Sequence, residues 1–474
     1  MDEFGVEIKS KDGNGFHVSL LGLFFLMSFS TLLGLFFDGN AAISNQMVTA
    51  TTTATKALVF LLVALFSRRI ETLIDKGLLL RIAVVVMVLG TALLILAWYL
   101  PDIVVIQSLS LPALYCMNAS YAVLYLAWLE LYSKLEMRSV LLYFSLVNLF
   151  SSILSFTLAQ MALYAVRPMI LAILPIISVL LLQRGKAKIQ LSGRLQDDNE
   201  SSSWSIPLRP IFLLIAFGFS NTFIRLFLTT QDKTVVLFGV CIAASSVLIL
   251  LFVQFKKFEL KLLYVVSIPL LVAGAMCAII GISSIEFLGA FLSNAAFVFF
   301  LIFITVLFCS ISYRYGVSAL WLFGFAHAGL SFGSMAAKLF GYGLRETFSL
   351  HSNLTIALSV LTVVFVLLSM NLISDKDFTT TWGITRQKPL EHESLDTQEK
   401  LLKTCSLISQ RYSLTRREEE ILVLLLQGVT LTGIGEKLFI AESTMKTHSR
   451  NIYKKLSVAN RKELQSFIES YYND

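Results

Sequence analysis

Cysteine is scarce in this sequence, with five residues among 474, and the five are widely scattered. Four of them lie inside long apolar stretches, and no two have the spacing of metal ligands or of a redox pair. We interpret the cysteines as packing residues, and we expect no metal site.

Catalytic motifs are absent too. The sequence holds no nucleophile elbow, phosphate-binding loop, metal-ligand cluster or paired carboxylates. This absence disfavours an enzyme, so we expect no catalytic residue and no cofactor. The N-terminus carries Asp2, Glu3 and Glu7 where a secretory signal would be basic, so we expect the first apolar stretch to be retained.

Hydrophobic residues, in contrast, are abundant. They make up 56% of the chain, with 37 phenylalanines, whereas soluble globular proteins have about 45–50% apolar residues even when glycine is counted. The composition therefore predicts an all-α polytopic membrane bundle, because about twenty apolar residues suffice to cross a bilayer. Twelve such stretches lie at residues 16–37, 41–66, 78–100, 103–132, 139–163, 168–182, 207–229, 234–255, 258–281, 285–312, 316–343 and 350–373.

Lysine and arginine in the short loops predict the orientation of these spans. With the N-terminus inside, the outer loops hold only Arg167, Lys233 and Arg345, and the other loop cations are internal. An even number of spans returns the C-terminus to the same side. We therefore expect a multi-pass protein of the cell inner membrane with both termini in the cytoplasm.

The spans form two groups of six, residues 1–183 and 207–373, joined by a basic polar linker at 184–206. This 6+6 arrangement resembles the major facilitator superfamily, in which two six-helix halves enclose a midplane cavity. The superfamily's Gly- and Arg-rich loop between spans two and three would fall at residues 67–77, which carry the charge without the pattern. That departure disfavours active transport.

Residues 374–411 form a polar tether that contains Pro389. From Thr397 onward, Leu401, Leu402, Cys405 and Ile408 recur at three- and four-residue spacing, which predicts a helix at its end. No receiver domain fits in this segment, so phosphorelay control is disfavoured. The membrane part itself becomes the candidate sensor.

The last segment, residues 412–474, follows the rules of short soluble helices. Thr415 and Glu418 have the spacing of a capping box that opens a helix, and a later helix is expected from about Glu442 to Leu456. Residues 443–462 contain six lysines and arginines and no acid, so positive charge gathers on one part of the domain. Charge segregation of this kind is typical of phosphate binding, although a solvated helix face gives the same pattern.

The residues themselves resemble the LuxR-type helix-turn-helix: LTRREEEIL at 414–422, then Gly428, Ile434 and Leu438, STMKTH at 443–448, NIYKKL at 451–456 and VANR at 458–461. The resemblance implies a four-helix domain whose third helix enters the major groove of DNA and whose fourth, at about 460–470, supports dimerisation. It places Lys446, Thr447 and Arg450 at base edges. It places Thr444, Lys454 and Lys455 nearer phosphate, and His448 in the packing of the domain.

Lys56 lies in the middle of the second predicted span, Arg225 in the outer part of the seventh and Lys338 in the outer part of the eleventh. A charge facing hydrocarbon costs about 2.5–3.5 kcal/mol at the bilayer centre, so such groups turn inward or extend to the headgroups. Both alternatives stay open for Arg225 and Lys338, whereas Lys56 is too deep to reach a surface. Glu130 and Glu286, the nearby acids, lie at the ends of their spans.

Unpaired cations facing a cavity favour an anionic ligand. We therefore expect a small carboxylate- or phenolate-bearing molecule, entering from outside, at Lys56, Arg225 and Lys338. His327, Trp128 and Trp321 are additional candidate contacts.

The leading hypothesis is a membrane-bound one-component transcriptional regulator whose transporter-like part senses a small molecule. The alternative is a major-facilitator-type transporter with an autoregulatory DNA-binding tail. The expected partners are double-stranded DNA, the lipid bilayer, a small anionic ligand, a second copy of the chain bound through the C-terminal domain, and RNA polymerase.

Overall fold

The computed structural model describes residues 17–36, 46–100, 103–160, 166–191, 203–204, 208–227, 234–253, 260–280, 283–315, 317–347, 386–387, 405, 407–409, 411–426, 434, 442–456, 458 and 463–464. The chain divides into two compact units. We name residues 1–199 with 206–385 the membrane unit, and residues 200–205 with 386–474 the C-terminal unit.

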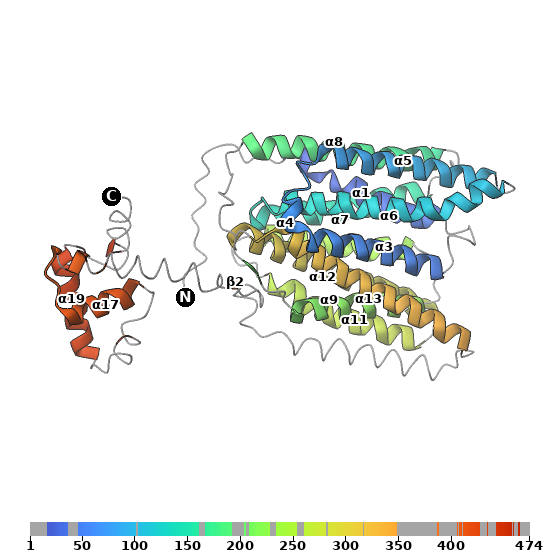
Figure 1. Cartoon of the computed structure of the whole chain (residues 1–474). Helices are drawn as coiled ribbons and strands as arrows, with labels where there is room; N and C mark the ends of the chain where they lie inside the picture. Colours follow the sequence, from blue (N-terminus) through green and yellow to red (C-terminus); the bar gives the residue numbers. More distant parts are fainter. Residues whose placement is uncertain are drawn as a thin grey trace. The chain divides into compact units, whose positions relative to one another are not determined.

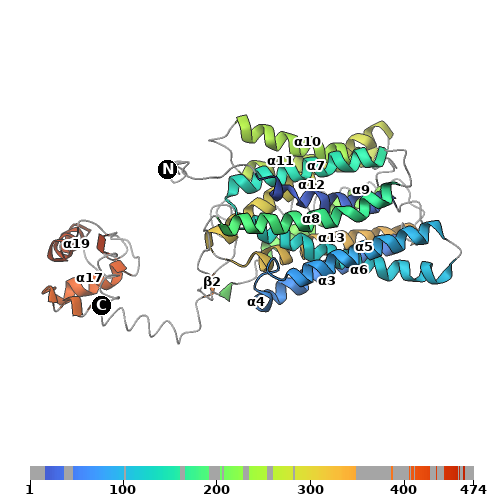
Figure 2. The same ribbon diagram turned by 90° about the horizontal axis from the view of Figure 1, so that it is seen from above.

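The described part of the membrane unit is built of helices that lie side by side in both views (Figures 1 and 2). In chain order they are η1 (Val18–Leu21), α1 (Leu23–Phe36), α3 (Gln46–Leu65), α4 (Ser67–Ile70), α5 (Gly77–Tyr99), α6 (Val104–Tyr132), α7 (Met137–Gln160), α8 (Val166–Leu191), α9 (Leu208–Phe227), α10 (Thr234–Val253), α11 (Lys261–Ile280), α12 (Ser283–Tyr315) and α13 (Ala319–Thr347).

Seven of these helices are long and apolar enough to cross a membrane, namely α3, α5, α6, α7, α8, α12 and α13. Shorter apolar helices occupy four more of the expected spans, at Val18–Gly34, Ile211–Leu226, Leu237–Leu251 and Lys261–Cys277. The last expected span, residues 350–373, lies outside the described residues. The chain is therefore a multi-pass membrane protein, while the count of twelve stays a prediction.

The two halves meet through a reciprocal pair of helix contacts. Helix α3, in the second span of the first half, packs along α13, in the fifth span of the second half. Helix α7, in the fifth span of the first half, packs along α10, in the second span of the second half. In each contact, the second span of one half packs against the fifth span of the other half. This symmetry is expected when the two halves have the same order of helices.

Glycine lets helices α9 and α13 approach closely within the second half. A Cβ atom at Gly333 would overlap the carbonyl oxygen of Ile215 and lie 2.8 Å from the amide nitrogen of Phe219. Small residues at such crossings are typical of membrane bundles, because lipid offers no hydrophobic drive and close packing supplies the attraction. The backbones of α9 and α13 are therefore in direct van der Waals contact at Gly333.

The segment between α4 and α5 is fixed to the bundle by a buried acid. Glu130 Oε2 accepts hydrogen bonds from the backbone nitrogens of Leu73, at 2.9 Å, and Ile74, at 3.2 Å. Asp75 forms an ion pair with Lys186 on α8, and the hydrogen bond from Lys186 lowers the pKa of Asp75 below its ordinary value. Glu130 therefore has a structural partner, and the loop that departs from the superfamily pattern is held in place.

The C-terminal unit contains α17 (Arg416–Leu426), α19 (Glu442–Leu456) and an apolar core of its own. The buried residues of that core are Cys405, Ile408, Ile421, Leu422, Leu425, Ile434, Ile452, Leu456 and Leu464. Cys405 and Ile408 belong to the segment predicted as the helical end of the tether, and both are helical and fully buried. Burial raises the pKa of the Cys405 thiol to about 11, in agreement with a packing role.

The C-terminal unit also holds a short antiparallel ribbon. Strand β1 (Ser203–Trp204) pairs with β2 (Arg386–Gln387). The all-α prediction missed this ribbon, because two-residue strands have no periodicity of their own. The predicted linker at 184–206 also begins inside α8, which continues to Leu191.

We predict that Gly333→Ala lowers the unfolding temperature of the purified protein in detergent, because the added methyl group must push α9 away from α13. Gly343→Ala is the matched control on the same helix, since a Cβ atom there meets nothing within 4 Å. An alanine at an open helical position is neutral or stabilising by up to about 1 kcal/mol. Equal unfolding temperatures for the two variants would contradict the close crossing.

Candidate nucleic-acid interface and intramembrane cation cluster

Helix α17 begins with the capping box that the sequence predicts. The Thr415 backbone nitrogen donates to Glu418 Oε2 at 2.8 Å, and the Glu418 nitrogen donates to Thr415 Oγ1 at 3.3 Å. Two amides that a helix start leaves unpaired are thereby satisfied. The prediction of this helix start is confirmed.

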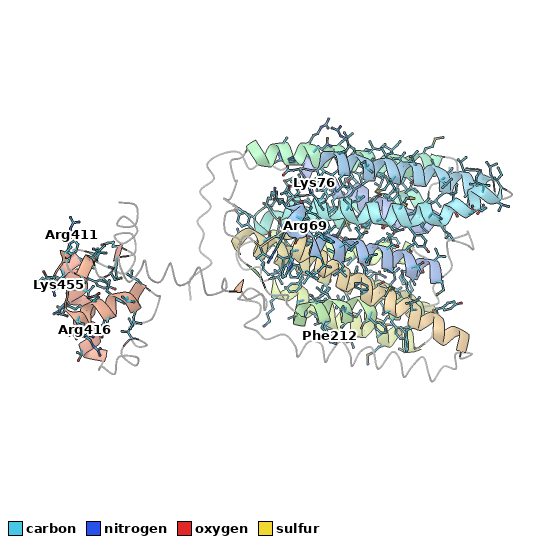
Figure 3. All side chains as sticks on the ribbon, in the orientation of Figure 1. Arg69, Lys76, Phe212, Arg411, Arg416 and Lys455 are labelled. Carbon is cyan, nitrogen blue, oxygen red and sulfur yellow. The ribbon has the colours of Figure 1, made fainter. Side chains whose placement is uncertain are left out.

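The capping carboxylate also joins α17 to α19. Lys455 Nζ lies 2.7 Å from Glu418 Oε2 and donates at 2.9 Å to the carbonyl oxygen of Ser413 (Lys455 is labelled in Figure 3). Ser413 has a positive φ of 51°, and the next amide, Leu414 N, donates back to Ser409 O, which is the ending expected of a Schellman motif. One lysine thus connects a helix start, the preceding helix end and α19.

The electrostatics of this contact favour an ionised Glu418. Burial alone would raise the pKa of the Glu418 carboxyl, but the hydrogen bonds from Lys455 and Thr415 outweigh burial and lower that pKa below its ordinary value. Glu418 is 4% exposed, so its charge is largely withdrawn from water. The pair is therefore a stabilising contact of the domain rather than a loose surface ion pair.

Helix α19 has the bounds that the sequence predicts and presents two different faces. Ser449, Ile452 and Leu456 are buried toward the core. On the opposite side, Thr444, Thr447, Arg450, Asn451 and Lys454 are exposed. An exposed polar and basic face on a helix of this length is what major-groove binding requires.

The predicted DNA-contact residues differ in exposure and in their contacts within the domain. Thr444, Thr447, Arg450 and Lys454 share the exposed face, while the side chain of Lys446 lies outside the described residues. Lys455, expected near phosphate, is engaged within the domain by Glu418 and Ser413. His448 is half-buried, as expected for a packing residue.

Asn451 is a candidate contact that sequence reasoning missed. It follows Thr447 by four residues and is exposed beside it, so both lie on one stripe of α19. The signal was available, because an asparagine amide binds an adenine edge through two hydrogen bonds. The sequence prediction did not include Asn451, because it concentrated on the basic and threonine residues of the helix.

The membrane unit holds a cluster of cations at the contact between α3 and α13. Lys338 Nζ donates to Thr53 Oγ1 at 2.7 Å and to the carbonyl oxygen of Thr49 at 3.1 Å. Lys56 follows Thr53 by three residues on α3. Arg225, whose side chain is exposed, follows Thr222 by three residues on α9, and the Thr222 hydroxyl donates at 2.8 Å to Ser334 Oγ, four residues before Lys338 on α13. The structure therefore brings together the three cations that the sequence selected, from α3, α9 and α13.

None of these three cations pairs with a carboxylate among the described residues. Lys56 Nζ lies 4.9 Å from the centre of the Tyr121 ring, an attractive contact that leaves its charge uncompensated. In the described part of the chain, Arg225 has neither an ion pair nor a hydrogen bond. The arrangement can attract an anion.

His327 lies beside this cluster in an aromatic cage. Its ring is 5.0 Å from the centre of Tyr125 and 5.4 Å from that of Phe60, which follows Lys56 by one helical turn. His327 is 7% exposed, and its Nε2 atom has no hydrogen-bond partner among the described residues. Thr49, Thr53 and Tyr121 are the neighbours that sequence reasoning did not select.

The two tryptophans proposed as ligand contacts lie elsewhere. Trp128 is fully buried beside Tyr132, and its indole nitrogen donates to Ser178 Oγ at 2.9 Å, so it serves packing. Trp321 stands in the first turn of α13, about 25 Å along the helix from Lys338 at 1.5 Å per residue. One small ligand at Lys338 does not reach Trp321.

Comparison with known proteins identifies the C-terminal domain. Residues 412–468 match the family described as "Bacterial regulatory proteins, luxR family". The chain is 55% identical over 49 residues to the transcriptional regulatory protein LiaR of Bacillus subtilis, which covers 10% of this chain and 23% of LiaR. It is 48% identical over 50 residues to the HTH-type transcriptional regulator MalT of Vibrio campbellii, which covers 10% of this chain and 6% of MalT.

These matches span less than a third of either relative's own length. The chain is also similar to a crystal structure of the E. coli fucose:proton symporter FucP (N162A), with a TM-score of 0.48, 13% identity and coverage of 75% of this chain and 98% of that one. A FucP structure in the outward conformation gives a TM-score of 0.47 and 14% identity, with the same coverage of both chains. Residues 412–468 are thus a LuxR-type helix-turn-helix DNA-binding domain, carried by a multi-pass membrane protein.

We predict that Glu418→Gln lowers the free energy of unfolding of a fragment 397–474 by about 1–2 kcal/mol at neutral pH, through loss of the charge-assisted bond to Lys455. Folding lowers the Glu418 pKa, so this stabilisation is full above an ordinary carboxyl pKa of about 4.3 and disappears as pH falls through the folded value. Urea unfolding at a series of pH values measures it.

Glu420→Gln is the control on the same helix, because its pair with Arg417 is exposed and worth at most about 1 kcal/mol. A Glu418→Gln fragment as stable as the Glu420→Gln fragment at neutral pH would refute the structural role of the Glu418–Lys455 pair.

Proposed function

We propose that this protein is a membrane-bound one-component transcriptional regulator, in which the membrane unit senses a small anion and controls sequence-specific DNA binding by the C-terminal domain. The observation that carries the proposal is the presence, on one chain, of a LuxR-type DNA-binding domain and of three intramembrane cations that pair with no carboxylate among the described residues. The first supplies an output and the second supplies an input.

At the DNA end, α19 enters the major groove, where Lys446, Thr447 and Arg450 read base edges. Asn451 extends this set along the exposed stripe. Thr444 and Lys454 contact phosphate, which fixes the register of the helix without reading sequence. Lys455 is paired with Glu418 rather than with phosphate. Its role in DNA binding is to hold α19 against α17 in the orientation that docking requires.

At the membrane end, the anion binds among Lys56, Arg225 and Lys338. These side chains come from both halves, so an anion between them favours whichever arrangement of the halves brings its partners closest. A ligand shifts a conformational equilibrium only through such a difference in affinity between states. The cation cluster therefore gives the membrane unit a means of responding to a ligand.

The output needs the C-terminal domain in the cytoplasm, the side that the loop charges predict for the C-terminus. DNA binding as a homodimer through this domain couples ligand state to operator occupancy, and bound protein contacts RNA polymerase to change transcription. The protein resides in the cell inner membrane.

We predict that Lys446→Ala and Arg450→Ala each lower the discrimination between operator and scrambled duplex by about 1–3 kcal/mol, because each removes a base contact. Lys454→Ala should weaken binding to both duplexes and reduce the salt dependence, because it removes a phosphate contact. Titrating fragment 397–474 against the two duplexes at several salt concentrations gives both quantities. An equal loss for every variant on every duplex would remove the base-reading assignment.

We also predict that Lys56→Met abolishes the transcriptional response to the inducing anion, while membrane insertion and operator binding in extracts stay intact. The cause is the loss of the deepest cation of the cluster. Trp321→Phe serves as control, because Trp321 lies far from the cluster. A reporter gene gives the dose–response, and an unchanged curve for Lys56→Met would reject anion sensing at this site.

A further inference from the structure

The contact between α3 and α13 joins the two halves and has two unlike ends. At one end, Gly324 of α13 lies directly on α3: a Cβ atom there would be 2.7 Å from Ala64 Cβ and 2.8 Å from the carbonyl oxygen of Phe60. The helices therefore touch through their backbones. Among the described residues, no hydrogen bond or ion pair joins the two helices at this end, where the ring of His327 packs against Phe60.

At the other end, Lys338 makes a polar contact between the two helices. Lys338 of α13 reaches α3 and donates to Thr53 Oγ1 and to the carbonyl oxygen of Thr49, which already accepts from Thr53 Oγ1 at 2.7 Å. Lys338 stands fourteen residues beyond Gly324, about 21 Å along the helix at 1.5 Å per residue. The two helices run antiparallel, so the fixed end and the polar end are well separated.

The hydrogen-bond partners of Lys338 are weak for a half-buried ammonium. They are a hydroxyl and a carbonyl, both neutral, whereas its charged neighbours are Lys56 and Arg225, which repel it. Hydrogen bonds between two ionised groups are stronger than those from a cation to a neutral acceptor. An anion that reaches this cluster therefore competes favourably with Thr49 and Thr53 for the ammonium, and it also relieves the repulsion among the three cations.

We propose that Lys338 is a releasable clasp between the two halves: without ligand it ties α13 to α3 at Thr49 and Thr53, and a bound anion takes its ammonium away. Release frees this end of the α3–α13 contact while Gly324 keeps the other end closed, so α13 pivots about Gly324. The inference rests on the proposed sensing function and names the residue that converts binding into movement.

Distances between spin labels test the clasp on the full-length protein in lipid nanodiscs. One label pair, at Met47 and Leu339, reports the clasp end, and a second, at Leu65 and Ser318, reports the Gly324 end; all four positions are exposed. Without ligand, Lys338→Met should lengthen the Met47–Leu339 distance by about 2 Å or more, the size of a hinge movement. The Leu65–Ser318 distance should not change.

Thr53→Val removes one acceptor at nearly constant volume and should broaden the Met47–Leu339 distribution toward the longer distance. Thr55→Val is its control, because the Thr55 hydroxyl donates within its own helix, to Thr51 O. Unaltered distances in both Lys338→Met and Thr53→Val would overturn the clasp.

Acetate, benzoate, succinate and inorganic phosphate, each at millimolar concentration, serve as probe anions. At least one should lengthen the Met47–Leu339 distance in the wild-type protein and none should lengthen it further in Lys338→Met. If the substitutions move the labels and no probe does, the clasp stands and its release by an anion is overturned. Operator binding by the same samples is a separate readout, so failure of the clasp is distinguishable from failure of DNA recognition.

Discussion

The main physical constraint in the membrane unit is positive charge among apolar helices that has no carboxylate partner among the described residues. Lys338 satisfies its ammonium with a hydroxyl and a carbonyl of α3, and Lys56 rests on the Tyr121 ring. Neither interaction removes the charge. Because an isolated charge is costly in this medium, the proposed anion would lower the cost of holding these cations between the helices.

The C-terminal unit depends instead on a small apolar core of its own. Its apolar core draws on both recognised helices and on Cys405 and Ile408 before them, and the Glu418–Lys455 pair fixes α19 against α17. That pair leaves the opposite face of α19 to Thr447, Arg450 and Lys454. The face of α19 that packs in the domain is therefore separate from the exposed face that we propose reads DNA.

Local signals in the sequence were enough for many of the helices and for the LuxR-type domain, but they missed the β1–β2 ribbon and the end of α8 at Leu191. The capping box at Thr415, the bounds of α19 and the three intramembrane cations follow from residues close in sequence or from the cost of a buried charge. Contacts between distant residues could not be predicted this way. Lys455 meets Glu418, Trp128 meets Ser178, and Lys338 meets Thr49 only after the chain has folded.

The central claim is that an anion acting on the membrane unit changes operator occupancy. The most direct measurement is operator occupancy in cells, by chromatin immunoprecipitation. Small molecules from the growth medium are separated into two fractions, one acidic and one neutral and basic, and each fraction is added to the cells in turn. The account predicts that the acidic fraction changes occupancy by the full-length protein and leaves fragment 397–474 unaffected. Equal occupancy by the full-length protein with either fraction, or a response of the fragment alone, would contradict it.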